Sequence, residues 1–93
     1  MFSTLKSLRA LADPTRREIL ALLSRREMTA GELADRFAST WPTMSHHFSV
    51  LKDAGLVLSR REGQQIRYSL NTTVVQGVLR WAMELVATRR QPR

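Results

Sequence analysis

The order of the structural signals between residues 29 and 70 constrains the fold of this chain more than any other feature. Thr29 and Glu32 have the spacing of a capping box, which predicts the start of a short helix. Pro42 suits the first position of a second helix, and Gly55 suits the position just after its end. The segment is therefore predicted to form two short helices separated by a bend.

Two strand-forming segments follow this pair of helices. Residues 56–61 and 66–70 have strand character, and residues 62–65 form a glycine-containing turn between them. Helix, bend, helix and hairpin is the order of a winged helix-turn-helix, with the helix-turn-helix at about 29–54 and the wing at about 56–70. In such a unit the second helix fits the major groove of DNA, and the hairpin can contact phosphate.

Three more helices are expected outside this unit. Apolar residues recur at helical spacing over residues 2–11, and Asp13 is placed to cap a helix over residues 14–25. A last helix, residues 73–88, starts after a cap at Asn71 or Thr72.

Residues 1–93 are thus predicted to form one domain that is mainly α-helical with a small β-hairpin (α+β), containing five helices and a two-stranded wing.

The charge of the chain favours a polyanion as partner. Its 15 Lys and Arg against 8 Asp and Glu give a net charge of +7. Residues 1–37 hold seven basic and five acidic side chains, whereas residues 38–93 hold eight and three, so most of the excess lies from the second helix of the unit onward. This bias suits nucleic acid. The alternative is a charge that only maintains solubility.

The second helix of the unit divides into two faces at 100° per residue. The inward face holds Met44, His47, Phe48, Val50, Leu51 and Ala54, and the outward face is short and polar. Hydroxyl side chains can bond base edges or phosphates, and the His46 ring can donate to guanine. The alternative is an ordinary solvated face. The residues predicted to contact DNA from this helix are Pro42, Thr43, Ser45, His46, Ser49 and Lys52.

The hairpin is predicted to add contacts to phosphate or to an adjacent minor groove. Ile66, Tyr68 and Leu70 alternate with polar residues, so one strand face should be core and the other wet. Arginine side chains beside a flexible polar turn can reach the phosphate groups of DNA or an adjacent minor groove. The alternative is a solvated hairpin with arginines for solubility. The predicted wing contacts are Arg60, Arg61, Gln64, Gln65 and Arg67.

The first and last helices, about 2–11 and 73–88, carry more apolar surface than a short monomer easily buries. A symmetric dimer through these helices would place two recognition helices about 34–36 Å apart, one turn of DNA. The competing account is a monomer whose terminal helices close the core. The predicted interface residues are Phe2, Leu5, Leu8, Val74, Val78, Trp81 and Leu85.

The chain resembles the ArsR-type winged helix-turn-helix repressors over nearly its whole length. The matching stretches are residues 10–17, 29–34, 44–48, 54–57 and 61–64, with Tyr68-Ser69-Leu70-Asn71 after the wing. With Leu70-Asn71-Thr72-Thr73-Val74, the pattern is most similar to the SdpR-like autorepressor subgroup. The resemblance implies a homodimer that binds an operator in double-stranded DNA, often in its own promoter, and blocks transcription.

Many members of this family sense metals, and here the chain departs from them. It has no cysteine, and its last helix offers Glu84 but no histidine. His46 and His47 diverge by 100° on a helix, so they cannot easily hold one ion. No metal site and no cofactor are therefore expected, and His47 is predicted to be a packed structural residue.

Other functions fit the sequence less well than DNA binding. Ser45 and Ser49 flank two histidines, but a hydrolytic or transfer enzyme also needs an oxyanion hole and a third group that orients the base. Nothing in the sequence supplies either of them. A winged-helix protein-interaction module should lose basic wing residues, yet Arg61 and Arg67 are present. Release of a repressor by an unidentified protein, a membrane partner or a small-molecule effector would fit equally well. Without a signal peptide or an apolar run of about 20 residues, the chain is expected to be cytoplasmic and not inserted in a membrane.

Overall fold

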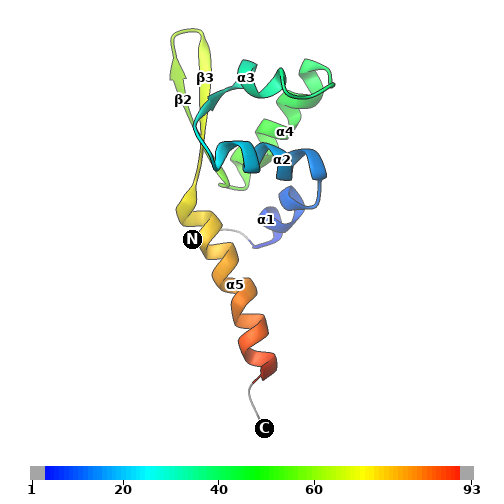
Figure 1. Cartoon of the computed structure of the whole chain (residues 1–93), viewed down its shortest axis with the longest axis vertical. Coiled ribbons are helices and arrows are strands. Elements are labelled where there is room, and N and C mark those ends of the chain that lie inside the picture. The colour runs from blue at the N-terminus through cyan, green and yellow to red at the C-terminus, as the bar shows by residue number, and fades with distance from the viewer. Residues whose placement is uncertain (1–3, 91–93) are drawn as a thin grey trace.

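The computed structural model, which describes residues 4–90, contains five helices and a small antiparallel sheet, whose hairpin lies to one side of α2, α3 and α4 (Figure 1). This confirms the mainly α-helical fold with a hairpin wing. In chain order the elements are α1 (Thr4–Leu11), α2 (Pro14–Leu23), β1 (Met28–Thr29), α3 (Ala30–Ala34), α4 (Trp41–Asp53), β2 (Val57–Glu62), β3 (Gln65–Leu70) and α5 (Thr72–Arg90).

Side-chain caps start three of these helices as the sequence predicts. The Asp13 carboxylate accepts the Arg16 backbone N–H at 3.0 Å at the start of α2. At α3, the Thr29 hydroxyl accepts the Glu32 N–H at 3.1 Å, and the Glu32 carboxylate accepts the Thr29 N–H at 2.8 Å, so the capping box is complete. The Asn71 side chain accepts the Val74 N–H at 3.4 Å and caps α5.

The capping box makes a testable contribution to acid stability. The Thr29 backbone N–H holds the pKa of the Glu32 carboxyl below its usual value of 4.5. A lowered folded-state pKa stabilises the fold above the unfolded pKa, and this contribution is lost as pH falls through the folded value. We expect Glu32→Gln, which keeps an acceptor but does not titrate, to lose less stability than the wild type between about pH 5 and pH 3. Urea denaturation at each pH measures this, and parallel pH profiles would contradict it.

The recognition helix α4 starts one residue earlier than predicted. Thr40 is its cap and Trp41 its first residue, so Pro42 occupies the second helical position. Its end is as predicted: Gly55 has φ +77°, and the N–H groups of Gly55 and Leu56 bond the carbonyls of Lys52 and Leu51 at 2.9 and 3.0 Å. A left-handed residue with these two bonds is the usual glycine termination of a helix.

The sheet has three strands, not two, in the order β1-β3-β2. Met28 of β1 pairs with Tyr68, and β2 pairs with β3 from Val57↔Leu70 to Glu62↔Gln65. The wing is the predicted two-stranded hairpin, formed by β2 and β3, and the sequence missed only β1, because two residues are too few to show an alternating pattern. The turn is also tighter than predicted, since Glu62 and Gln65 are themselves paired.

The central position of β3 changes the exposure of its polar residues. The sequence predicts a wet face at Arg67 and Ser69, but both are only half-exposed. Pairing with β1 on one edge and β2 on the other covers β3 on both sides. The face that the sequence predicts to be wet is therefore only partly exposed.

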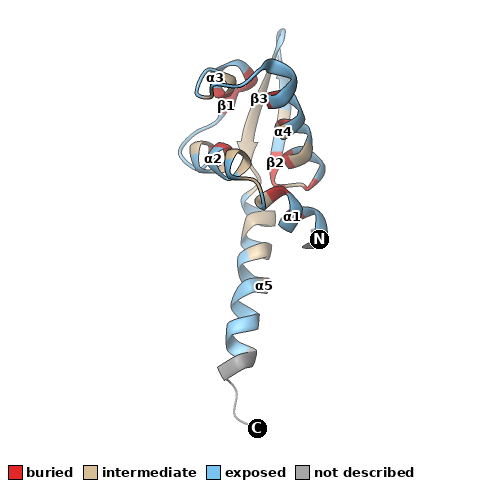
Figure 2. Cartoon of the chain, turned by 90° about the vertical axis from the view of Figure 1, so that its right-hand side faces the viewer, coloured by how far each residue is buried: buried red, intermediate tan, exposed pale blue. Residues whose placement is uncertain are grey.

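The core lies between α2, α3, α4 and the sheet, and α5 projects away from it (Figure 2). The domain measures 57 × 24 × 21 Å, and the hairpin and α5 extend in opposite directions along its long axis (Figure 1). Val74, Val75 and Val78 in the first turns of α5 pack against the core, whereas the later turns are mostly exposed. Only Asn71 separates β3 from α5, and its backbone N–H bonds the Leu56 carbonyl at 3.0 Å.

Candidate nucleic-acid interface

The outward face of α4 is open to solvent along its length. All six residues that the helical angles place there as DNA contacts are exposed: Pro42, Thr43, Ser45, His46, Ser49 and Lys52. On the opposite face Met44, Phe48 and Leu51 are buried in the core. The predicted division of the helix into two faces is confirmed, and a polar ridge of hydroxyl and imidazole groups is presented outward.

The two ends of this ridge are tied to other parts of the chain. At the N-terminal end the Thr43 hydroxyl lies 3.0 Å from the Thr40 hydroxyl, within the helix cap. At the C-terminal end Asp53 forms an ion pair with Lys6 of α1 at 3.4 Å. Ser45, His46 and Ser49 form no side-chain hydrogen bond or ion pair with any residue in the described part of the chain, so their polar groups are available.

Arg16 anchors α4 to the first two helices. Its Nε donates to the Ala10 carbonyl at 2.7 Å and its Nη2 to the Arg9 carbonyl at 2.9 Å. Its Nη1 lies 3.3 Å from Nδ1 of His47 on the inner side of α4. A guanidinium only donates, so His47 Nδ1 is the acceptor in this contact.

The surroundings of His47 confirm that it is a structural residue. Its side chain is 12% exposed, and its Nδ1 lies 3.9 Å from the Asp13 carboxylate. The Arg16 backbone N–H lowers the pKa of Asp13, and the positive charge of the Arg16 guanidinium acts in the same direction. Sequence reasoning missed Arg16, because no local pattern shows that its side chain reaches a helix thirty residues further on.

The wing arginines are not equivalent. Arg67 forms a two-pronged pair with Glu62, with Nε and Nη2 both within 3.1 Å of the carboxylate, and its side chain is 25% exposed. This contact lowers the pKa of Glu62 and raises that of Arg67. Arg60 pairs with Glu27 at 3.1 Å and with Glu62 at 3.6 Å.

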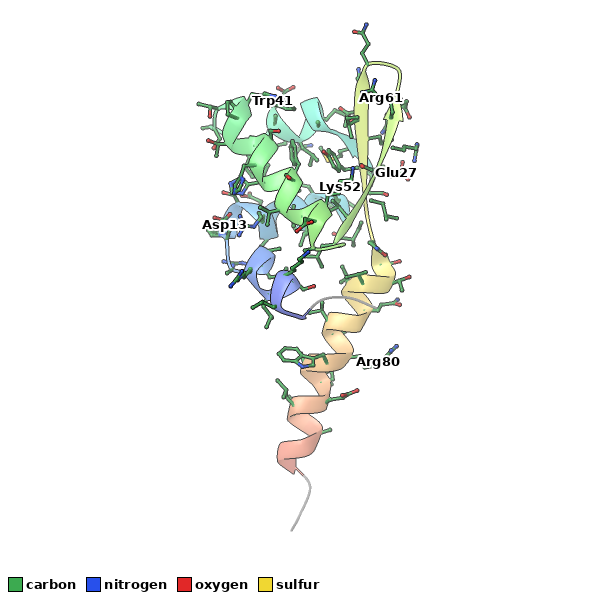
Figure 3. All side chains as sticks on the ribbon, turned by 180° about the vertical axis from the view of Figure 1, so that it is seen from behind. Asp13, Glu27, Trp41, Lys52, Arg61 and Arg80 are labelled. Carbon is green, nitrogen blue, oxygen red and sulfur yellow. The ribbon has the colours of Figure 1, made fainter. Side chains whose placement is uncertain are left out.

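Arg61 is the wing arginine whose charge is left uncompensated. It is exposed, and no carboxylate in the described part of the chain lies within ion-pair distance of it. Gln64 and Gln65 are also exposed at the tip. Figure 3 shows Arg61 on the hairpin at the end of the domain opposite α5. The sequence shows three arginines around the wing, but Glu62 pairs with Arg67 across the turn, and Arg60 pairs with Glu27 and Glu62.

Metal ligands do not gather on this surface. Among the residues that the structure describes, no three His, Asp or Glu side chains converge as a bound ion would require. Nor is any helix within residues 4–90 long and apolar enough to cross a membrane.

An exposed polar recognition helix, a preceding short helix and a basic hairpin define a winged helix-turn-helix, a class of DNA-binding domain. Comparison with known proteins agrees with this class. A family model described as a helix-turn-helix domain matches residues 11–60.

The chain belongs to the ArsR family of winged helix-turn-helix transcriptional repressors. It is 46% identical to the transcriptional repressor SdpR of Bacillus subtilis, over 84% of this chain and 87% of that protein. It is 38% identical to a probable mercury resistance operon repressor of Streptomyces lividans, over 91% of this chain and 68% of that protein. A crystal structure of an ArsR family transcriptional regulator superposes with a TM-score of 0.90 at 30% identity, covering 97% of this chain and 100% of the other. The family consists of regulators of transcription, not of enzymes.

Proposed function

We propose that this protein is a sequence-specific transcriptional repressor that binds a palindromic operator as a homodimer, with its own promoter among the targets. The observation that carries the proposal is the outward ridge of α4 beside the uncompensated Arg61: its Ser45, His46 and Ser49 side chains are exposed and form no hydrogen bond or ion pair with any residue that the structure describes. One α4 would enter the major groove in each half-site. Repression is then steric, because a dimer over a promoter blocks the polymerase.

The proposed contacts with DNA are of two kinds, those of the recognition helix and those of the wing. We assign base-edge or phosphate contacts to the helix residues Pro42, Thr43, Ser45, His46, Ser49 and Lys52, and phosphate or minor-groove contacts to the wing residues Arg60, Arg61, Gln64, Gln65 and Arg67. Arg61 is the strongest candidate among the wing cations. To bind a phosphate, Arg67 would have to release Glu62, and Arg60 would have to release both Glu27 and Glu62.

The unburied apolar surface of α1 and α5 supports the dimer. Leu5 and Leu8 on α1 are exposed, as are Leu79, Met83, Leu85 and Val86 on α5. A hollow of about 490 Å³ between α2 and α5 is lined almost wholly by apolar side chains and continues this surface.

The residues proposed for the interface differ in their exposure to solvent. Leu5, Leu8 and Leu85 are exposed, Trp81 is half-exposed, and Val74 and Val78 partly pack on their own core. Phe2 lies outside the described residues.

The signal that releases the repressor from DNA would be an unidentified protein or small-molecule effector. A winged-helix module that binds only proteins is the alternative function, but the open cation Arg61 favours DNA. A DNA target implies action in the compartment that holds the DNA, which is the cytoplasm of a cell without a nucleus.

A gel-shift titration with the DNA upstream of the protein's own gene tests the proposal. We expect a discrete complex that resists an excess of an unrelated fragment. Equal competition by both fragments would contradict sequence-specific binding, and no complex at low ionic strength would contradict DNA binding altogether.

His46→Ala is expected to weaken operator binding by about 1–3 kcal/mol and to relax base preference at one position in each half-site, because a hydrogen bond to a base edge is removed. Titration of operators mutated at single base pairs measures this. A loss of equal size on every DNA sequence would show that His46 does not read a base.

Arg61→Ala is expected to weaken binding to all sequences alike and to reduce the slope of log K against log salt by about one for each phosphate that the side chain no longer neutralises. Arg80→Ala is the matched control, because Arg80 is an exposed arginine on α5, remote from the hairpin (Figure 3). An unchanged slope in Arg61→Ala would show that this residue does not contact phosphate.

A further inference from the structure

Trp41 is an exposed aromatic residue at the edge of the proposed DNA-binding surface. It is the first residue of α4 and is 54% exposed. Its ring meets that of Phe48 edge-on, with centroids 6.1 Å apart and planes at 64°, so one side of the indole is held against the core. Its indole N–H makes no hydrogen bond with any residue in the described part of the chain. Figure 3 shows Trp41 at the same end of the domain as Arg61.

Trp41 is the α4 residue that lines a hollow between the start of α3 and the hairpin. The hollow measures about 640 Å³. Its other walls are the start of α3, residues 29–32, and residues 64–67 of the hairpin. The one acidic side chain of the lining, Glu32, is directed toward the Thr29 N–H at 2.8 Å and Arg26 at 3.5 Å. The exposed amides of Gln64 and Gln65 face the same space.

The position of this hollow matches the path of a DNA strand. If α4 occupies a major groove and the wing contacts the adjacent minor groove, the sugar–phosphate backbone between the two grooves passes between α4 and the hairpin. A neutral N–H donor held there by packing can bond a phosphate oxygen without a long side chain having to be ordered.

We propose that Trp41 binds the DNA backbone, with its indole N–H donating to a phosphate oxygen where the strand passes between α4 and the wing. This inference rests on the proposed function. It adds a contact that carries no base information and no charge, in contrast to those of His46 and Arg61.

The two tryptophans of the chain allow a direct test of proximity. Trp41→Phe leaves Trp81 as the only indole, so the difference between the wild type and this variant reports Trp41. Addition of an unlabelled operator duplex to the wild type should change the tryptophan emission saturably, and Trp41→Phe should lack this change. The midpoint should equal that measured by anisotropy of a labelled duplex in a parallel titration. Anisotropy that reports binding while Trp41 emission stays constant would overturn the inference and leave the proposed function standing.

Trp41→Phe tests the hydrogen bond, because it keeps the edge contact with Phe48 and removes the N–H. We expect affinity to fall about 2- to 10-fold on the operator and on unrelated DNA alike, with an unchanged salt slope because the missing donor is neutral. Wild-type affinity would overturn the assignment, and so would a loss confined to the operator, which would indicate a base contact. A wild-type protein that binds no duplex at all would instead refute the proposed function. Equal urea midpoints for Trp41→Phe and wild type exclude a loss through unfolding.

Discussion

Leu85→Glu is expected to convert the proposed dimer into monomers and to lower operator affinity by about 10²- to 10⁴-fold, because the second half-site contact is then no longer intramolecular. Leu85 is 57% exposed on the part of α5 that projects from the domain. In a symmetric dimer the substitution introduces one carboxylate from each subunit into the same interface. Burying these charges without a partner of opposite charge is costly. Leu8→Glu should act in the same direction from α1.

Sedimentation and gel shift together measure this prediction. Gln76→Glu is the matched control, because it adds the same charge to an exposed polar position of the same helix. An unchanged dimer in Leu85→Glu would move the interface elsewhere on the molecule. Monomers that retain full operator affinity would break the proposed link between association and DNA binding.

Leu51→Ala is expected to reduce the free energy of unfolding by about 2–5 kcal/mol, a large share of the stability of a small domain. Leu51 is 1% exposed on the inner face of α4, and its carbonyl also bonds the Leu56 N–H that ends the helix. Truncation of its side chain would leave a cavity directly beneath the recognition surface.

Urea denaturation measures the effect of Leu51→Ala. Leu58→Ala is the control, since Leu58 is 53% exposed on β2 and its truncation removes little buried surface. Comparable losses in the two variants would mean that the inner face of α4 does not form the core.

Local features of this fold could be predicted from the sequence because their causes are local. The caps at Asp13 and Thr29 and the glycine termination at Gly55 depend on residues within five positions of one another. The two faces of α4 follow from helical geometry alone. β1 was missed because its two residues become a strand only by pairing with β3, about forty positions away.

The recognition-helix part of the candidate site could be predicted from the sequence, but the ion pairs of the wing could not. Exposure of Ser45, His46 and Ser49 follows from the helix angle, so the ridge could be located from the sequence. The unequal wing arginines could not be foreseen, because the Glu62–Arg67 pair depends on the tight turn that brings the two side chains together. The contact of Arg16 with His47 likewise arises only when α2 and α4 pack.

The short junction at Asn71 has a mechanical consequence. Its side chain caps α5, its carbonyl accepts the Val75 N–H at 3.1 Å, and its own N–H is bound to Leu56, so no slack exists between the hairpin and the last helix. If two copies of the chain pack against each other along α5, a change in the angle between the two α5 helices necessarily changes the distance between the two hairpins. A signal that tilts one helix against its twin would then alter the spacing that the duplex has to match, without touching any side chain that meets DNA.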